Sequence, residues 1–287
     1  MKVDIQSVVN DVQKLYAKDK DKLNRISVGN NLKSMSDGEF LTMPDWYQKA
    51  TNTKGLPFGG MVMIAGDSDS GKTSCAIAAM KAAQEQYVSI IYVETEGKTT
   101  TQDLINWKVD PLQIMLVKSS IAEEAFDMLF KLWDSFNEKY PDEKLLVIFD
   151  SIGNVVSKHD LEMDMTTTNQ KPGGKGKTNR LGINSLIARS RNGNTATLII
   201  NYTYDNIGSP GKTNAGGKSL NLFSSLTYQT SRKSWLEKTV KGEKFRVGAK
   251  VQWKLFKNHI DKQNPGPKVV ELDITKDGVA LAGTPQE

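Results

Sequence analysis

The chain has 287 residues, of which 38% are hydrophobic and 25% charged; this composition supports one large folded core or at most two domains and excludes an intrinsically disordered chain. No run approaches the ~18 apolar residues of a membrane span, so we expect a cytoplasmic protein that has no membrane partner. The formal net charge of +5 is compatible with a polyanionic partner, and the single cysteine, Cys75, excludes an internal disulfide bond.

The N-terminal part of the chain is expected to form a separate helical segment. Apolar residues recur at spacings of three and four, which predicts an amphipathic helix over roughly Ile5–Lys18. The charged run Lys18–Lys22 separates this helix from the rest, so the helix packs either on its own core or on a neighbouring subunit. We expect an N-terminal helical or oligomerisation segment over residues 1–50 and a main domain over residues 51–287.

A glycine-bounded loop follows the apolar run that begins at Met61. The spacing from Gly66 to Gly71, Lys72 and Thr73 matches G-x-x-x-x-G-K-T, and an alanine-rich helix follows it. In such a loop backbone N–H groups face a polyphosphate, the lysine reaches the β- and γ-phosphates, and the threonine hydroxyl binds Mg²⁺. A simple glycine turn would need neither the lysine nor the threonine. The expected ATP-contacting residues are Gly66, Asp67, Ser68, Asp69, Ser70, Gly71, Lys72, Thr73 and Ser74.

Two later strands are predicted to end in carboxylates. The apolar run Tyr87–Val93 predicts a strand buried on both faces. Glu94 and Glu96 follow it where a parallel sheet places its ligands, although a polar strand end also accounts for them. The run Leu145–Phe149 closes on Asp150, and downstream of a phosphate-binding loop such an aspartate binds Mg²⁺ directly or through water. The expected metal ligands are Thr73 and Asp150.

The pattern of elements predicts the fold class. Strand and helix signals alternate over Met61–Asn201, which implies an α/β fold with a mostly parallel, doubly wound sheet flanked by helices. From Leu222 the pattern changes to strands alone, which we expect to extend the same sheet in antiparallel fashion. The expected strands are Leu222–Ser231, Phe245–Leu255, Lys268–Thr275 and Val279–Ala282, with a hairpin turn at Lys241–Glu243 between the first two.

Two segments interrupt this alternation. Asp160–Arg180 has no apolar period and is rich in glycine, threonine and lysine, and Tyr202–Ser219 is rich in glycine and carries two lysines. We expect both to be structureless loops at the nucleotide edge of the sheet, where they form a basic track for single-stranded nucleic acid. Two solvated surface loops are the alternative. The expected DNA contacts, near residues 155–180 and 202–219, are Lys158, Lys171, Lys175, Lys177, Arg180, Lys212 and Lys218.

The order of these parts resembles the RecA/RadA recombinase ATPases, most closely the bacteriophage UvsX type, over about Gly55–Ala282. The stretch YVETEG is similar to the family's strand with the catalytic glutamate, and the resemblance places that role on Glu96 beside Glu94. The stretch FDSIGNVVSK is similar to the Mg²⁺-binding strand and the start of the first DNA-binding loop, and IINYTYDNIG is similar to the second. The resemblance also implies a nucleotide sensor at Asn201 and Tyr202.

Further roles follow from the same resemblance. It implies a catalytic role for Lys72 in its own site and for Lys257 in the site of a neighbouring subunit, where a delivered cation stabilises the transferring phosphoryl group. Two positions depart from the family pattern. Tyr202 stands where glutamine or histidine is usual, and His259 stands where a second basic residue is usual.

The resemblance implies a RecA-like ATPase core and a DNA-dependent ATPase activity that uses ATP and Mg²⁺. Such a protein forms a helical filament of itself on single-stranded DNA and catalyses homologous pairing and strand exchange with duplex DNA. Single-strand-binding and mediator proteins are further implied partners, and the host cytoplasm is the implied location if the source is viral. Two alternatives stay open, namely a hexameric helicase-type DNA motor and a non-catalytic recombination mediator.

Overall fold

The computed structural model describes residues 4–17, 35–162, 174–191, 193–205, 212–215, 218–263 and 265–283. The chain divides into two compact units, Met1–Gly38 and Glu39–Glu287. The expected division near residue 50 stays a prediction. Within the described residues, no helix is both long enough and apolar enough to cross a bilayer.

The first unit contains helix α1 (Ile5–Leu15) and the short 3-10 helix η2 (Met35–Asp37). The Asp4 carboxylate caps α1 by accepting the backbone N–H of Ser7, and this confirms the amphipathic helix expected from the apolar spacing. No residue of α1 is buried, and the side chains of Val8 and Leu15 are 56% and 80% exposed. Part of the apolar stripe of α1 is therefore exposed among the described residues of its own unit.

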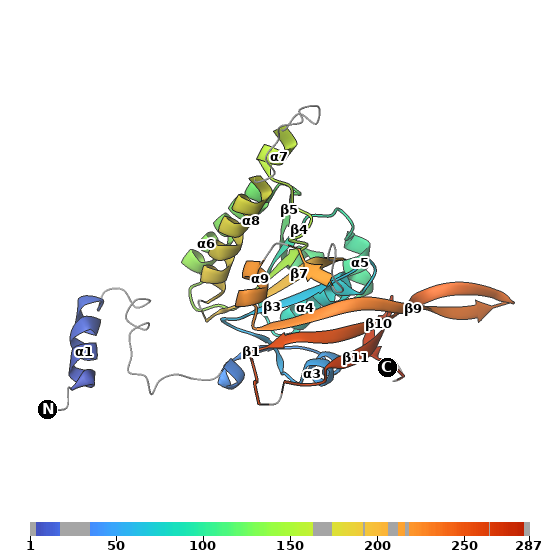
Figure 1. Cartoon of the computed structure of the whole chain (residues 1–287), viewed down its shortest axis with the longest axis horizontal. Coiled ribbons are helices and arrows are strands. Elements are labelled where there is room, and N and C mark those ends of the chain that lie inside the picture. The colour runs from blue at the N-terminus through green and yellow to red at the C-terminus, as the bar shows by residue number, and fades with distance from the viewer. Residues whose placement is uncertain are drawn as a thin grey trace. The chain divides into compact units, whose positions relative to one another are not determined.

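The second unit is built on one large sheet whose strand order is β12-β11-β10-β9-β3-β7-β6-β4-β5, with β8 paired to β7 (Figure 1). The strands from β9 to β5 in this order run parallel, whereas β10, β11 and β12 are added antiparallel. This confirms the predicted mixed sheet. The strands are β3 (Met61–Gly66), β4 (Ser89–Glu94), β5 (Ile114–Lys118), β6 (Leu145–Asp150), β7 (Thr195–Asp205), β8 (Lys212–Asn214), β9 (Leu226–Val240), β10 (Glu243–Asn258), β11 (Val269–Thr275) and β12 (Gly278–Leu281).

Helices cover the parallel part of the sheet because its central strands are apolar on both faces. On one face, Val93, Val147 and Phe149 pack against Trp133 of α6 and Ile183 of α8. Helix α4 contacts the same strands but contributes nothing to that cluster, which places α4 on the other face. The helices of this unit are α3 (Asp45–Thr51), α4 (Lys72–Glu85), α5 (Thr101–Asn106), η3 (Pro111–Gln113), α6 (Ala122–Lys139), α7 (Lys158–Glu162), α8 (Gly174–Ser190) and α9 (Lys218–Phe223).

A small aromatic cluster joins α3 to the antiparallel strands β9 and β10. The strands β1 (Phe40–Thr42) and β2 (Gly55–Pro57) form a separate antiparallel pair, and α3 lies between them in the chain. The ring of Tyr47 on α3 meets the ring of Trp253 edge-on, and Trp253 in turn contacts the ring of Tyr228. Helix α3 thereby packs against strands β9 and β10.

Strands β9 and β10 extend beyond the sheet as a two-stranded ribbon (Figure 1). The partner strand β11 pairs with β10 only over Gly248–Lys254, so the part nearer the turn has no other neighbouring strand in the described chain. The turn at Lys241 and Gly242 has φ angles of 51° and 85°, which are the left-handed values that a tight hairpin needs. The predicted hairpin turn is confirmed.

The two segments expected to be structureless are partly regular. Helix α7 ends at Glu162 and α8 begins at Gly174, so about half of the first segment is helical. The helix that carries the apolar residues from Leu181 onward also includes the polar residues 174–180, since each further turn adds backbone hydrogen bonds to a helix that has already formed. In the second segment, β7 continues to Asp205, β8 pairs with it, and α9 begins at Lys218. Residues 163–173, which include Lys171, lie outside the described residues, as do 206–211 and 216–217.

Candidate nucleotide-binding site

The loop between β3 and α4 depends on two glycines. A Cβ atom on Gly66 would lie 2.2 Å from the backbone oxygen of Thr230, so only glycine allows β9 to pass this closely. Gly71 precedes α4 with φ 78°, a left-handed conformation that glycine adopts without a penalty. The Ser70 hydroxyl hydrogen-bonds the Thr230 hydroxyl at 2.6 Å and fixes the loop between them. The sequence motif therefore forms the curved loop expected of it.

Substituting Gly66 with alanine is expected to lower the free energy of unfolding by at least about 2 kcal/mol, because the added methyl group must displace the β9 backbone. Gly193→Ala is a stringent control, since no atom lies within 4 Å of its Cβ position, while its positive φ of 82°, which Gly66 does not share, adds a backbone strain that Gly66→Ala lacks. Urea unfolding of the two variants measures the difference. Equal destabilisation by both substitutions would show that the close approach of β9 is unimportant.

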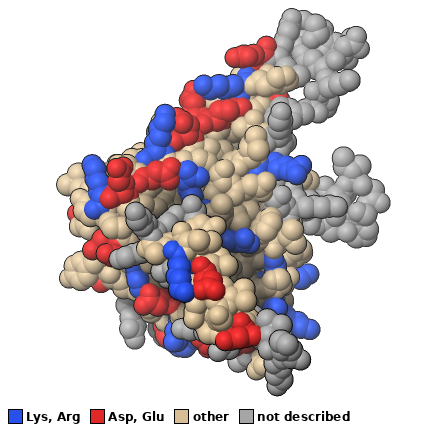
Figure 2. All heavy atoms as spheres, turned by 90° about the vertical axis from the view of Figure 1, so that its left-hand side faces the viewer, with Lys and Arg blue, Asp and Glu red and all other residues tan. Residues whose placement is uncertain are grey.

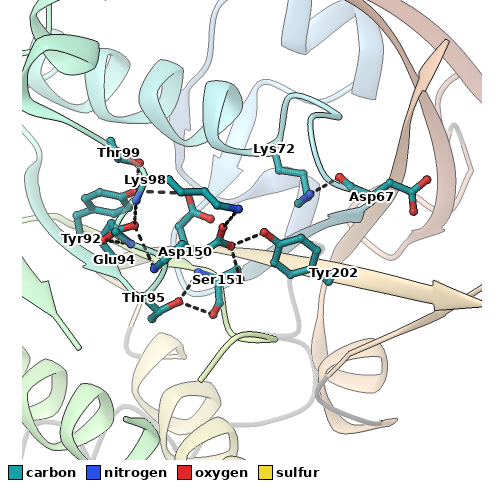
Figure 3. A network of polar contacts seen from close by, with 12 residues as sticks. Asp67, Lys72, Tyr92, Glu94, Thr95, Lys98, Thr99, Asp150, Ser151 and Tyr202 are labelled. Atoms are coloured by element: carbon teal, nitrogen blue, oxygen red, sulfur yellow. Dashed lines mark hydrogen bonds and ion pairs between the residues drawn. The ribbon is translucent and has the colours of Figure 1, made fainter. Parts of the chain in front are cut away.

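The Lys72 side chain lies at the floor of the loop and is buried. Its ammonium group donates to the Asp67 carbonyl oxygen at 2.5 Å and lies 4.5 Å from the ring centroid of Tyr202 (Figure 3). Desolvation lowers the pKa of Lys72, and the nearby carboxylates of Asp150 and Glu96 partly offset that effect. A cation held at one carbonyl in a partly desolvated cleft is well placed to bind a phosphate.

The Asp150 carboxylate occupies the end of β6 beside the same loop. Burial raises its pKa to about 6, while a hydrogen bond from the Thr73 hydroxyl acts in the opposite direction. A buried carboxylate and a hydroxyl in contact are hard oxygen donors of the kind that Mg²⁺ prefers, and a cation there would compensate the buried charge. Thr73 and Asp150 therefore fit the predicted metal site.

Glu94 and Glu96 have different environments. The buried Glu94 carboxylate accepts the backbone N–H groups of Glu96, Gly97 and Lys98 at 3.1, 2.9 and 3.2 Å. These three hydrogen bonds hold the loop that follows β4 (Figure 3). Since this loop carries Glu96, the role of Glu94 is to position it.

The Glu96 carboxylate is held by three side chains from three parts of the chain. Its Oε1 accepts the hydroxyls of Tyr202 and Ser151 at 2.6 and 2.8 Å, and its Oε2 lies 2.8 Å from the Lys98 ammonium. Burial alone would raise its pKa, but these hydrogen bonds bring the pKa below its ordinary value. Glu96 is therefore an oriented carboxylate that stays charged near neutral pH.

Lys72, Asp150 and Glu96 line one cleft with a volume of about 220 Å³, whereas Glu94 is not among its lining residues. Most residues predicted from the phosphate-loop motif line this cleft, as do the predicted carboxylates Glu96 and Asp150. Gly66 and Asp67 lie immediately before the lining part of the loop. The lining residues are Ser68, Asp69, Ser70, Gly71, Lys72, Thr73, Ser74, Glu96, Lys98, Asp150 and Tyr202.

The comparison with known proteins agrees with this geometry. Residues 4–279 match the family model described as RecA N-terminal domain. The chain belongs to this family. Protein RecA of Mycoplasma mycoides subsp. mycoides SC is 26% identical over 260 residues, which cover 89% of this chain and 70% of the relative.

Two further relatives of this RecA-family chain are similarly distant. Protein RecA of Sulfurovum sp. (strain NBC37-1) is 26% identical over 234 residues, covering 80% of this chain and 63% of the relative. Protein RecA of Mesoplasma florum is 28% identical over 232 residues, which cover 79% of this chain and 64% of the relative. The chain thus spans less than two thirds of the length of these two relatives.

In this RecA-family chain, Lys257 does not line its own cleft. Its ammonium group donates to the carbonyl oxygens of Asn221 and Leu222 at 2.9 and 2.6 Å, at the end of α9. Burial lowers the pKa of Lys257. Any role of Lys257 in hydrolysis would therefore be in the cleft of another copy, and that role stays a prediction.

The predicted sensor residues, Asn201 and Tyr202, lie where the strand beside the cleft continues into the second predicted loop. The buried Asn201 amide donates to the Ala215 carbonyl at 2.7 Å and accepts the Tyr202 N–H at 2.9 Å. Sequence reasoning missed Lys98, whose position two residues after Glu96 in the same loop was the available signal.

Of the seven predicted DNA contacts, Lys158 and Arg180 have described side chains, and they lie on α7 and α8, which contact each other. Lys158 forms an ion pair with Glu124 at 3.2 Å, and Arg180 is exposed on α8. Lys175 and Lys177 belong to α8, Lys212 to β8 and Lys218 to α9. Lys171 lies outside the described residues. Their roles in DNA binding stay predictions.

Proposed function

We propose that this chain is a DNA-dependent ATPase of the bacteriophage UvsX type that assembles on single-stranded DNA and promotes homologous pairing and strand exchange. The observation that carries the proposal is the convergence of Lys72, Asp150 and the oriented Glu96 carboxylate in one cleft. Membership of the RecA N-terminal domain family supports the same conclusion.

The residues of the cleft divide the chemistry among them. The loop amides and Lys72 would hold the β- and γ-phosphates, and Thr73 with Asp150 would hold Mg²⁺. When bound, the metal neutralises charge on the phosphate oxygens. Glu96 orients the attacking water and accepts its proton, which requires a carboxylate that is charged and fixed in position.

Tyr202 connects this chemistry to the second DNA-binding loop. Its hydroxyl donates to Glu96, and its carbonyl oxygen accepts the Ala215 N–H at 2.8 Å. A shift of the carboxylate on nucleotide binding therefore pulls on the base of the loop. Tyrosine takes over the sensor role through one short hydrogen bond to a charged group.

Removing only that hydroxyl, by Tyr202→Phe, is expected to cut the stimulation of ATP hydrolysis by DNA about tenfold, because a hydrogen bond to a charged group contributes roughly 1.5–3 kcal/mol. Nucleotide affinity should stay within about twofold of the parent, since the ring beside Lys72 is kept. Tyr204→Phe, at an exposed tyrosine of the same strand, is the control. Undiminished stimulation in the Tyr202 variant would contradict the coupling role.

Assembly of several copies would complete the nucleotide cleft and cover the exposed apolar residues of α1. In a head-to-tail arrangement Lys257 of one copy reaches the cleft of the next, and the exposed apolar face of α1 packs on a neighbouring copy. The basic residues near α7, α8 and β8 then follow the DNA strand, and duplex DNA and mediator or single-strand-binding proteins engage the assembled filament.

Electron microscopy with single-stranded DNA and a non-hydrolysable ATP analogue tests the proposal. A helical filament on DNA is expected, whereas closed rings would favour a hexameric motor and unassembled protein would contradict both. A strand-exchange assay separates a recombinase from a non-catalytic mediator. The mediator remains a candidate because Tyr202 departs from the residues usual at the sensor position.

A further inference from the structure

Among the described residues that line the nucleotide cleft, two are cationic, Lys72 and Lys98, and the proposed function uses only Lys72. An exposed lysine is usually a solvated surface group, and on the face drawn in Figure 2 basic side chains are intermixed with acidic ones. Lys98 differs from such a lysine, because its ammonium group lies 2.8 Å from the Glu96 carboxylate within the cleft. Figure 3 shows its side chain reaching from the loop after β4 toward Lys72 and Tyr202.

The backbone of this loop fixes the position from which the Lys98 side chain extends. The Lys98 N–H donates to the Glu94 carboxylate at 3.2 Å, beside the N–H groups of Glu96 and Gly97. Gly97 has a φ of 69°, a left-handed conformation that turns the chain between Glu96 and Lys98. The Lys98 side chain is 67% exposed, whereas that of Glu96 is only 9% exposed. The lysine is therefore free to change partners while the glutamate stays in place.

The two oxygens of the Glu96 carboxylate are engaged differently. Oε1 accepts the hydroxyls of Tyr202 and Ser151, which take both of its lone pairs. Oε2 is thus the oxygen left for an attacking water, and the Lys98 ammonium takes one of its two acceptor positions. A water on that oxygen would lie beside a positive charge, which opposes transfer of its proton to the carboxylate. Glu96 therefore accepts a proton more readily once Lys98 has moved away.

The terminal phosphate of a bound triphosphate would be a stronger partner for Lys98 than Glu96 is. Besides desolvation, the charge of Lys98 contributes to lowering the pKa of Lys72, so the two ammonium groups are near enough to interact. An ion pair that includes an exposed lysine is weak, whereas a terminal phosphate has three acceptor oxygens and more negative charge than a carboxylate. The flexible four-carbon stem of lysine allows the change of partner without movement of the backbone.

We propose that Lys98 binds the γ-phosphate of the nucleoside triphosphate and leaves the Glu96 carboxylate to do so. The inference rests on the proposed function in taking ATP as the ligand of the cleft. The ammonium group then adds a second cation from the same copy to the transferring phosphoryl group, and Oε2 becomes free for the attacking water. A diphosphate has no γ-phosphate, so Lys98 stays on Glu96 when ADP is bound.

The affinities of the cleft for two nucleotides test the proposal. Binding of a non-hydrolysable ATP analogue and of ADP is measured by competition with a fluorescent nucleotide. In Lys98→Gln the affinity for the analogue is expected to fall about tenfold, because a charge-assisted hydrogen bond to the γ-phosphate is lost. The affinity for ADP should stay within about twofold of the parent value. Lys98→Arg should keep most of the preference for the analogue, since it retains the positive charge.

Lys118→Gln is the matched control for the lost charge. Lys118 is exposed at the end of β5, in register with Glu94 on the neighbouring strand, and does not line the cleft. This variant should keep the parent ratio of the two affinities. All three variants should keep the melting temperature of the parent, because both lysines are exposed.

A double variant tests whether Lys98 changes partners. In Glu96→Gln protein the ammonium group has no carboxylate to leave, so binding to the γ-phosphate meets no competition. Adding Lys98→Gln to that variant should therefore lower the ratio of the two affinities by more than it does in the parent background. An equal effect in both backgrounds would contradict the change of partner.

Three further outcomes decide against the inference. If Lys98→Gln slows hydrolysis but keeps the parent ratio, Lys98 only orients Glu96 and the proposal is wrong. If the variant binds both nucleotides more weakly by the same factor, the effect does not involve the γ-phosphate and the proposal is again wrong. Both results leave the proposed function intact. If the parent protein binds neither nucleotide, the proposed function fails and the inference fails with it.

Discussion

Lys72→Ala is expected to reduce DNA-stimulated ATP hydrolysis to background, a loss of roughly 10³-fold or more. The ammonium group is buried beside the Asp150 and Glu96 carboxylates, so its removal leaves two anions facing the incoming triphosphate. Nucleotide binding should weaken with hydrolysis, because the same group holds the phosphates in the ground state. ATPase rates with and without single-stranded DNA, together with binding of a fluorescent nucleotide, measure both effects.

Lys81→Ala provides the control on the same helix, since Lys81 lies in the exposed part of α4 and forms only a loose ion pair with Glu85 at 4.0 Å. It should hydrolyse ATP at the parent rate. A Lys72 variant with an unchanged DNA-stimulated rate would refute the assignment of the cleft as the nucleotide site.

Glu96→Gln is expected to slow hydrolysis by about 10²–10⁴-fold while nucleotide binding is retained. The amide keeps the size of the side chain and its hydrogen bond from Ser151 or Tyr202, but it cannot accept a proton from water. The variant should therefore remain on single-stranded DNA longer in ATP than the parent does. Single-turnover hydrolysis and dissociation from a labelled oligonucleotide are the measurements.

Glu94→Gln separates catalysis from loop support. The Glu94 carboxylate accepts three backbone N–H groups with its two oxygens, and glutamine offers only one oxygen for them. We expect a lower melting temperature and a smaller loss of hydrolysis than in the Glu96 variant. If Glu94→Gln lost the greater part of the activity at an unchanged melting temperature, the two roles would have to be exchanged.

The phosphate loop, Asp150 and the sheet could be predicted because each is encoded in a short stretch. A glycine spacing defines the loop, and continuous apolar runs define strands buried on both faces. The contact between Tyr202 and Glu96 joins residues 106 positions apart, and no local pattern reports it. The resemblance to the RecA family identified Glu96 and Tyr202 as site residues but did not predict the hydrogen bond between them.

The hairpin formed by β9 and β10 shows where strand patterns fail to predict the ends of strands. The sequence predicted strands that stop at Ser231 and restart at Phe245, whereas β9 continues to Val240 and β10 begins at Glu243. Residues 237–247 are exposed on both faces, so polar and apolar side chains do not alternate there, and the pattern that marks a half-buried strand is lost. Helix α8 was missed at its start for a similar reason, because glycine and lysine there gave no apolar period.

Mixing two inactive variants tests most directly whether the site is shared between copies. In an equal mixture of Lys72→Ala and Lys257→Gln protein, a cleft with Lys72 meets a neighbour with Lys257 in about a quarter of random head-to-tail contacts. DNA-stimulated ATP hydrolysis should therefore recover to about a quarter of the parent rate. A mixture no more active than the average of the two variants alone would contradict a nucleotide site completed by the next copy.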